Sequence, residues 1–319
     1  MATTLLSIRG LTTVFHCRQG QIEAFNNVDL DIDQGQVLGL IGETGCGKSV
    51  LGMSILRLLP PNGVSRGQII YKYRDLLGLS PQVMQRIRGA EIGLLPQNPS
   101  ASLNPVLSVG QQLMEGLRLH RMIKKEKARV AAQTLLGCYG LRGFNNRYDE
   151  YPHQLSGGMK QRVLAALSIT GKPSLLIADE PTKGLDGVAR NQVVALLRQL
   201  TRETKMALLL ITHDLKVAAN LCDQIAVMYC GEIVENGPVG KVLVSPLHPY
   251  TQGLLASLPE NGLHPIPDYS PGVPGDIQGC RFYPRCRYRQ DKCSCQTIKN
   301  KRINETYVRC LSASEGREN

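Results

Sequence analysis

Hydrophobic and polar positions along this chain follow two different periods. In residues 28–33 apolar and acidic residues alternate, which predicts a half-buried β-strand. Residues 37–41 are all apolar or glycine, and residues 174–178 and 206–212 are almost entirely apolar. Runs of this length and composition are typical of strands that are buried on both faces of a parallel sheet.

Three further segments repeat apolar residues at helical spacing. Residues 50–59 predict a helix that ends before Pro60, and residues 128–136 predict an amphipathic helix that stops at Gly137. Val193, Leu196 and Leu200 mark one face of a third helix. Strands that alternate with helices indicate an α/β fold with a parallel sheet. The helical stretch at about residues 106–165 is interpreted as an insert into that core.

Length and composition restrict the class of protein. The 319 residues allow two domains, or one large domain with an appendage. No apolar run approaches the roughly 18–20 residues that span a bilayer. The N-terminus lacks the charged n-region and the cleavage site of a signal peptide, so we expect a cytosolic chain. The net charge is +11, and residues 271–319 carry ten Lys and Arg against five Asp and Glu.

The first chemical motif lies at residues 42–49 (GETGCGKS), which match G-x-x-x-x-G-K-[ST]. A predicted strand precedes the motif and a predicted helix follows it, which argues against an ordinary glycine turn. Backbone N–H groups of such a loop wrap phosphates at a helix N-terminus. Lys48 would bridge the β- and γ-phosphates of a nucleotide, and Ser49 would bind Mg²⁺.

Two more segments extend this chemistry. Asp179 and Glu180 follow a predicted buried strand, at the edge where α/β sheets bind ligands. Asp179 would hold Mg²⁺ directly or through water, and Glu180 would orient or deprotonate the attacking water. Residues 156–158 (SGG) open an apolar helix, either as a plain N-cap or as a second phosphate-binding device. One nucleotide does not need two such devices from the same chain.

The order of these motifs resembles that of the ATP-binding cassette (ABC) ATPases. It runs from the P-loop through Gln97, a signature-like LSGGM at residues 155–159, Asp179 with Glu180, GLD at residues 184–186, and His213. The resemblance covers about residues 5–260. It implies a P-loop NTPase (RecA-like) core with an N-terminal antiparallel β subdomain and a helical signalling insert, in a cassette of residues 1–240. It also implies a head-to-tail dimer, in which each ATP lies between one P-loop and the partner's signature motif.

Site residues follow from the same resemblance, position by position. The implied catalytic residues are Glu180, His213 and Gln97. The implied Mg²⁺ ligands are Ser49, Gln97 and Asp179. The implied ATP-contacting residues are Phe15, Gly42, Glu43, Thr44, Gly45, Cys46, Gly47, Lys48, Ser49, Val50, Ser156, Gly157, Gly158 and Asp186. Phe15 would stack on adenine, although an ordinary core phenylalanine is the alternative. Cys46 is either a tolerated small side chain or a site where alkylation blocks the loop.

Three segments are similar to the oligopeptide/dipeptide/nickel importer branch: residues 97–105 (QNPSASLNP), 248–252 (HPYTQ) and 279–286 (GCRFYPRC). Members of that branch end in a cysteine-rich tail, here residues 241–319, and in some of them the tail holds a [4Fe–4S] cluster. The corresponding ligands are Cys280, Cys286, Cys293 and Cys310, with Cys295 as an alternative to Cys293. Their gaps exceed usual zinc spacing, and the basic tail suits a cluster with negative charge. Zinc or unligated thiols remain alternatives.

The resemblance implies an ATP hydrolase that powers a membrane importer for peptides, nickel or related solutes. The expected partners are two transmembrane permease subunits, a second cassette (paralogous or identical), and indirectly an extracytoplasmic solute-binding protein. The expected location is peripheral, at the cytoplasmic face of the cell membrane. The alternative is a soluble ABC ATPase that acts on nucleic acid or ribosomes, which the basic tail supports. We expect no nucleic acid; anionic lipid headgroups could also attract that tail.

Overall fold

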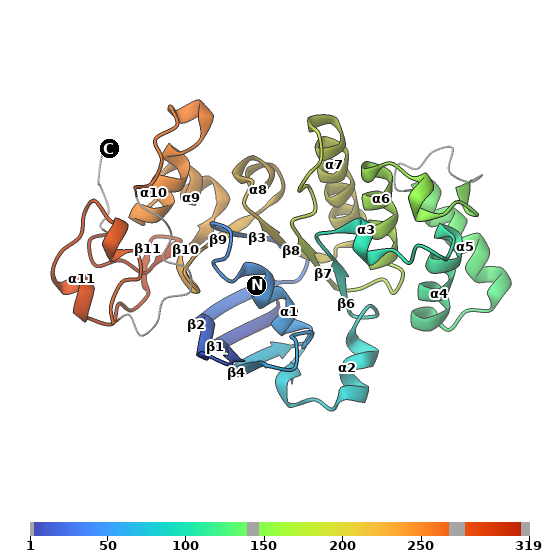
Figure 1. The fold of residues 1–319 in the computed structure, drawn as a ribbon, viewed down its shortest axis with the longest axis horizontal. Helices are drawn as coiled ribbons and strands as arrows, with labels where there is room; N and C mark the ends of the chain where they lie inside the picture. Colours follow the sequence, from blue (N-terminus) through green and yellow to red (C-terminus); the bar gives the residue numbers. More distant parts are fainter. Residues whose placement is uncertain (1–2, 139–146, 268–277, 314–319) are drawn as a thin grey trace. The chain divides into compact units, whose positions relative to one another are not determined.

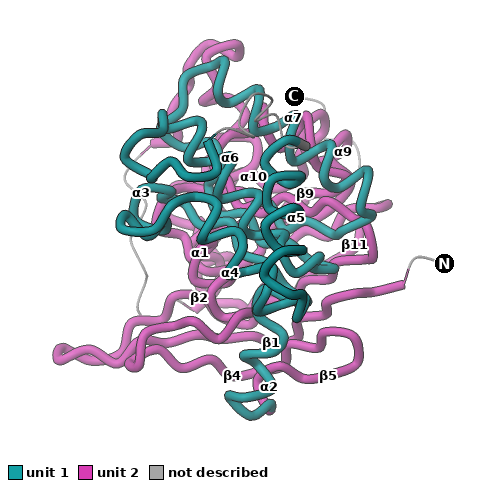
Figure 2. The backbone as a smooth tube through the Cα atoms, turned by 90° about the vertical axis from the view of Figure 1, so that its right-hand side faces the viewer, with its two compact units in different colours: residues 1–2, 79–210 teal, residues 3–78, 211–319 magenta. Residues whose placement is uncertain are grey.

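The computed structural model describes residues 3–138, 147–267 and 278–313 (Figure 1). Among these residues, 79–210 form one compact unit (unit 1), and 3–78 together with those from 211 onward form the other (unit 2) (Figure 2). The N-terminal strands and the described C-terminal segment therefore belong to the same unit. The boundary at residue 240 stays a prediction. Residues 139–146 of the predicted insert, and residues 268–277 and 314–319 of the predicted tail, lie outside the described residues.

Unit 2 begins with an antiparallel sheet of four strands in the order β2-β1-β4-β5. The strands are β1 (Thr4–Cys17), β2 (Gly20–Asp33), β4 (Gly63–Tyr71) and β5 (Arg74–Asp75). The alternation at the end of β2 is confirmed, because Val28, Leu30 and Ile32 are buried while Asp29 and Asp31 are exposed. This sheet is the antiparallel β subdomain that the resemblance implied.

A second sheet of unit 2 carries the P-loop strand, with the order β11-β12-β10-β9-β3 within this unit. The strands are β3 (Val37–Ile41), β9 (Gln224–Tyr229), β10 (Glu232–Pro238), β11 (Lys301–Ile303) and β12 (Thr306–Val308). β3 pairs in parallel with β9, whereas β10 and the hairpin of β11 and β12 pair antiparallel. All five residues of β3 are buried, as the apolar run predicted. The C-terminal tail thus contributes strands to the sheet that holds the P-loop.

Unit 1 contains the parallel pair β6 (Ile92–Leu95) and β7 (Leu175–Asp179), with helices before and after it. Its helices are α2 (Pro81–Ile87), α3 (Pro99–Ser102), α4 (Val109–Arg121), α5 (Lys125–Cys138), α6 (Gly157–Ser168) and α7 (Gly187–Thr204), with the 3-10 turn η3 (Pro152–Gln154). Strand β8 (Ala207–Thr212) begins in unit 1 and ends in unit 2. The predicted strands at 174–178 and 206–212 and the helix around residues 193–200 are confirmed.

Other helices of unit 2 flank its strands. They are α1 (Lys48–Ile55), α8 (Leu215–Leu221), α9 (Val239–Val244), α10 (Pro249–Ala256) and α11 (Lys292–Cys295), with 3-10 turns η1 (Leu76–Gly78), η4 (Pro259–Asn261) and η5 (Tyr283–Arg285). Among the described residues, no helix combines the length and the apolarity needed to cross a membrane.

Two predicted helix ends differ from the structure. The helix predicted at residues 50–59 is α1, which starts at Lys48 and already ends at Ile55, because Arg57 adopts a left-handed backbone conformation (φ +51°) before the prolines are reached. α5 continues to Cys138, one residue beyond Gly137. Gly137 does not adopt the positive φ of a C-terminal cap, so it does not stop the helix there.

Candidate functional site

The P-loop, residues 42–49, joins β3 to α1, and its glycines are required by its backbone. Gly42 has φ +156° and Gly47 has φ +106°, which favour glycine. A Cβ on Gly42 would lie 2.1 Å from the carbonyl oxygen of Met228, and a Cβ on Gly47 would lie 2.7 Å from that of Ala24. The loop therefore packs directly against neighbouring backbone, and a side chain at either position would displace it.

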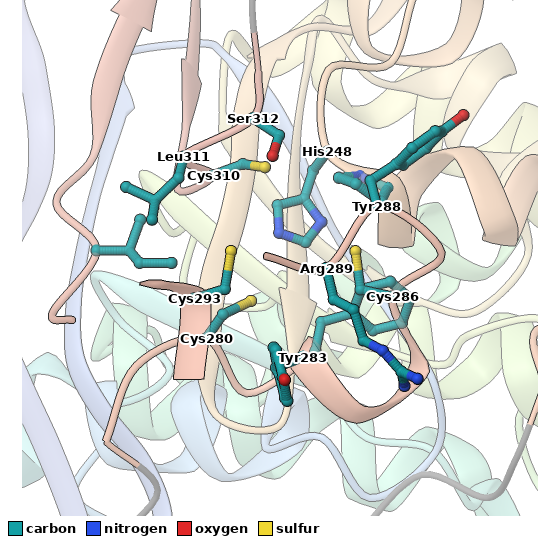
Figure 3. A pocket seen from close by; sticks show the side chains of 13 residues that line it. His248, Cys280, Tyr283, Cys286, Tyr288, Arg289, Cys293, Cys310, Leu311 and Ser312 are labelled. Atoms are coloured by element: carbon teal, nitrogen blue, oxygen red, sulfur yellow. The ribbon is translucent and has the colours of Figure 1, made fainter. Parts of the chain in front are cut away.

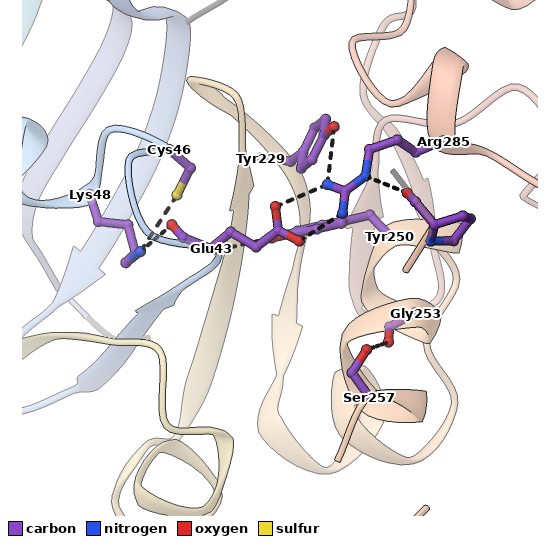
Figure 4. Close-up of polar contacts among 9 residues, drawn as sticks. Glu43, Cys46, Lys48, Tyr229, Tyr250, Gly253, Ser257 and Arg285 are labelled. Carbon is purple, nitrogen blue, oxygen red and sulfur yellow. Dashed lines mark hydrogen bonds and ion pairs between the residues drawn. The ribbon is translucent and has the colours of Figure 1, made fainter. Parts of the chain in front are cut away.

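Lys48 is held inside the loop. Its Nζ donates hydrogen bonds of 2.8 Å to the carbonyl oxygens of Gly42 and Glu43, and the same Nζ lies 3.6 Å from the Sγ of Cys46 (Figure 4). The ammonium is buried, so its positive charge lies inside the loop and is weakly screened by water. Thr44, Gly45 and Ser49 are exposed, and Val50 is half-buried. The loop thus combines exposed backbone with a fixed internal cation, which suits the binding of a phosphate chain.

In unit 1, three predicted catalytic and Mg²⁺-binding residues gather at one edge of a parallel strand pair. The register pairs Leu95 of β6 with Ala178 of β7. Asp179 ends β7, Glu180 follows it, and Gln97 lies just beyond β6, so all three lie at the carboxyl ends of their strands. Glu180 is 9% exposed and adopts φ +47°. A positive φ at a residue other than glycine is costly and is often associated with functional sites.

The signature motif forms a helix N-terminus, as predicted. The Ser156 Oγ accepts a hydrogen bond of 3.4 Å from the Met159 N–H and caps α6, while Gly157 and Gly158 begin the helix. Asp186 caps α7 in the same way, accepting from the Ala189 N–H at 2.8 Å. A Cβ on Gly158 would lie 3.4 Å from that of Ala189, so the two helix N-termini are neighbours within unit 1.

Phe15 and His213 belong to unit 2. Phe15 is half-buried in β1, where its ring lies against Gly63 of β4. His213 directly follows β8 and is exposed. The predicted site residues thus divide into one set that belongs to unit 2 (Phe15, the P-loop and His213) and one that belongs to unit 1. Their assigned roles in ATP hydrolysis stay predictions.

Four tail cysteines line one pocket of unit 2. Cys280, Cys286, Cys293 and Cys310 surround this pocket together with His248 (Figure 3). The Cys280 N–H donates to the Cys293 carbonyl oxygen at 2.7 Å, which ties two of these turns together. Burial raises the pKa of the Cys280 thiol to about 12, and the neighbouring Cys286 and Cys310 contribute to the increase. Among the described residues, no three His, Cys, Asp or Glu side chains are arranged to bind one metal ion.

Cys293 and Cys295 have different environments. Cys293 is buried and lines the pocket, whereas Cys295 is exposed and does not line it. The Cys295 Sγ instead faces the carbonyl oxygens of Asp291 and Lys292 at 3.8 and 3.9 Å.

His248 is a pocket residue to which the sequence analysis assigned no role. Its Nδ1 accepts a hydrogen bond of 3.0 Å from the Tyr250 N–H, so Nε2 carries the proton of the neutral ring. Nε2 is buried near the Arg309 backbone, but it completes no hydrogen bond of normal geometry among the described residues. Burial lowers the pKa of His248 to about 3, so the ring is neutral at physiological pH. The HPYTQ segment that carried the family resemblance was the signal that could have drawn attention to it.

Comparisons with known proteins agree with this fold. The ABC transporter family matches residues 25–183, and the oligopeptide/dipeptide transporter C-terminal region matches residues 234–293. A Brucella ovis protein named for ATP binding in peptide import is 40% identical across 98% of this chain and 98% of its own. A Brucella melitensis biotype 1 protein with the same type of name is 43% identical across 91% of this chain and 89% of its own.

Solved structures with similar folds are ATPase cassettes. A dimeric ATP-binding cassette in a post-hydrolysis state with ADP and Pi has a TM-score of 0.66 and 26% identity, covering 73% of this chain and 98% of that one. CbiO1 from Clostridium perfringens, part of the ABC transporter complex cbiONQ, has a TM-score of 0.65 and 26% identity, covering 76% and 92%. The fold and the P-loop thus define a P-loop ATPase cassette. The chain belongs to the ABC transporter family, and it hydrolyses ATP in a reaction that is coupled to transport.

Proposed function

We propose that this chain is the energising subunit of a peptide importer. The observation that carries the proposal is the glycine-dependent P-loop with its buried Lys48, in a chain that matches peptide-import relatives over nearly its whole length. The subunit would dock peripherally at the cytoplasmic face of the membrane on two transmembrane permease subunits. A solute-binding protein outside would deliver the peptide. Nickel or a related solute is the alternative to a peptide as the transported solute.

Within this proposal, hydrolysis uses residues of two cassettes. The P-loop and Lys48 hold the phosphates, while Ser49, Asp179 and Gln97 surround Mg²⁺. Glu180 orients and deprotonates the attacking water, and His213 holds the γ-phosphate. The N-terminus of α6, with Ser156, Gly157 and Gly158, completes the partner's nucleotide site, and Asp186 contacts the opposite subunit. The second cassette is an identical or a paralogous copy.

Part of the positive charge of the basic tail is used in internal ion pairs. Arg281 pairs with Glu23 and Glu232, and Arg309 pairs with Glu232 at 3.2 Å. Other tail cations, such as Arg287 and Lys292, are exposed, so tail charge does not by itself decide between the two functions. The soluble ATPase that acts on nucleic acid or ribosomes is not the function we propose, because the relatives that match nearly the whole chain are named for peptide import.

Glu180→Gln tests the hydrolytic assignment. In the complex reconstituted with its permease subunits, we expect this variant to bind ATP normally and to hydrolyse it at least about 100-fold more slowly, because the general base is lost. Glu203→Gln, an exposed change of the same chemistry in α7, is the matched control and should hydrolyse ATP at the normal rate. Near-normal turnover by Glu180→Gln would refute the role of Glu180. Stimulation by a peptide-loaded or a nickel-loaded binding protein would identify the solute.

We also propose that Cys280, Cys286, Cys293 and Cys310 hold a [4Fe–4S] cluster. The four thiols line one pocket, and four cysteine thiolates are the ligand set that holds an iron–sulfur cluster. The buried Nε2–H of His248, which lines the same pocket, is a donor suited to a sulfur acceptor. When bound, the cluster would supply a covalent link between the tail turns that carry its ligands.

A further inference from the structure

An arginine of the cysteine-rich tail reaches the P-loop. Arg285 ends the 3-10 turn η5 and directly precedes Cys286. Its Nη1 donates to Glu43 Oε2 at 3.0 Å, and its Nη2 donates to Glu43 Oε1 at 3.3 Å (Figure 4). Such two-pronged, charge-assisted hydrogen bonds are among the strong ones in proteins and fix the orientation of both groups. Glu43 is the second residue of the P-loop, 242 positions away in sequence.

The guanidinium of Arg285 is itself held in place. Its Nε donates to the Pro267 carbonyl oxygen at 3.0 Å, and its Nη1 also lies 3.5 Å from the Tyr229 hydroxyl. The side chain of Arg285 is only 5% exposed, against 26% for Glu43. The pair is therefore largely shielded from water. A shielded ion pair is stronger than one at an exposed surface.

Glu43 is restrained on three sides. Arg285 binds its carboxylate, the Tyr250 hydroxyl accepts a hydrogen bond of 3.0 Å from its N–H, and Lys48 Nζ donates to its carbonyl oxygen at 2.8 Å. Tyr250 is fully buried, and its ring lies 5.5 Å from that of Phe282, another tail residue. Contacts from the tail thus fix the same P-loop residue to which the phosphate-binding lysine is bonded.

We propose that Arg285 is a positioning residue for nucleotide binding: the C-terminal tail holds the P-loop in its phosphate-binding shape through the Arg285–Glu43 pair. ATP binding then draws on tail contacts as well as on the P-loop. Because Arg285 adjoins Cys286, a change in the cysteine pocket that moves this turn alters nucleotide affinity, and the coupling is reciprocal. The inference rests on ATP binding at the P-loop, and it holds whatever the pocket binds.

Nucleotide affinity of matched arginine variants tests the proposal. The full chain is titrated with AMP-PNP and Mg²⁺ by calorimetry, as wild type, Arg285→Gln and Arg309→Gln. Arg309 is the control because it also precedes a pocket cysteine and pairs with a buried carboxylate, Glu232, outside the P-loop. We expect Arg285→Gln to bind at least about tenfold more weakly, the scale of a lost charge-assisted hydrogen bond. Arg309→Gln should bind as wild type does.

A second variant tests the same ion pair if Arg285→Gln folds poorly. Glu43→Gln removes the same pair from its more exposed side, and we expect it to weaken binding to a similar extent. The double variant should bind no more weakly than either single one, because both remove one interaction. In ATPase assays KM should rise while kcat changes little, which a general loss of stability would not produce.

The outcomes separate this inference from the proposed function. If wild type binds no nucleotide, the proposed function fails. If wild type binds but Arg285→Gln and Glu43→Gln bind equally well, only the positioning role is overturned. Equal weakening by Arg285→Gln and Arg309→Gln, accompanied by equal losses in melting temperature, would also overturn it, because tail stability would then explain the effect.

Discussion

At the scale of single residues, the P-loop shows how local chemistry and its surroundings act together. Gly42 and Gly47 are necessary because backbone oxygens of Met228 and Ala24 occupy the space where side chains would lie. Glu180 adopts a left-handed conformation directly after a buried strand. The motif pattern predicts these identities, whereas the contacts that require Gly42 and Gly47 are made by the folded chain.

Cys46 illustrates a prediction at this scale. The thiol is 5% exposed, and burial raises its pKa, although nearby Lys48 partly opposes the increase. A smaller thiolate fraction and poor access both slow alkylation. We expect iodoacetamide at pH 7 to modify Cys46 at least about tenfold more slowly than the exposed Cys17, as measured by peptide mass spectrometry. Modification of both cysteines at the same rate would contradict this expectation.

At the scale of elements, helix N-termini carry two kinds of function. Ser108 caps α4 in a capping box with Gln111, which is a structural role. Ser156 caps α6 with one hydrogen bond, and the family resemblance gives the same N-terminus a nucleotide in the partner cassette. Sequence spacing predicts both caps, but it does not separate the structural one from the functional one.

Serine-to-alanine variants of the two caps separate these roles. Each variant should lose about 1 kcal/mol of stability, because each removes one cap hydrogen bond. Only Ser156→Ala should also lower ATP hydrolysis by the assembled transporter, by at least about tenfold, since a donor to the phosphates is lost as well. Thermal unfolding and steady-state turnover measure the two effects. Equal turnover in both variants would make Ser156 a structural cap alone.

At the scale of the whole molecule, the C-terminal tail is part of the fold of unit 2. The β11–β12 hairpin pairs with β10, and Val308 is fully buried there. Arg281 and Arg309 both pair with the buried Glu232. Burial raises the pKa of Glu232, and the two arginines offset part of that increase. The basic composition of the tail therefore serves internal pairing at these positions.

At this scale, the prediction concerns the metal that the cysteine-rich tail binds. After purification without oxygen, we expect about four irons and four acid-labile sulfides per chain, with broad visible absorption. Cys293→Ser should abolish the cluster, whereas Cys295→Ser, a matched control on the same short helix, should retain it because Cys295 does not line the pocket. Zinc in place of iron, or loss of iron from Cys295→Ser with retention in Cys293→Ser, would contradict the assignment.

The sequence by itself determined the class of protein, because phosphate binding and hydrolysis use short contiguous segments with strict residue requirements. It also placed β3, β7, β8 and α7, whose apolar runs and spacing are local signals. The early end of α1 at Ile55 followed from a left-handed Arg57, which no periodicity predicts. Only the tertiary structure brought Arg285 to Glu43 and His248 to the four cysteines. Those contacts join residues distant in sequence, and a periodic pattern contains no information about which distant side chains meet.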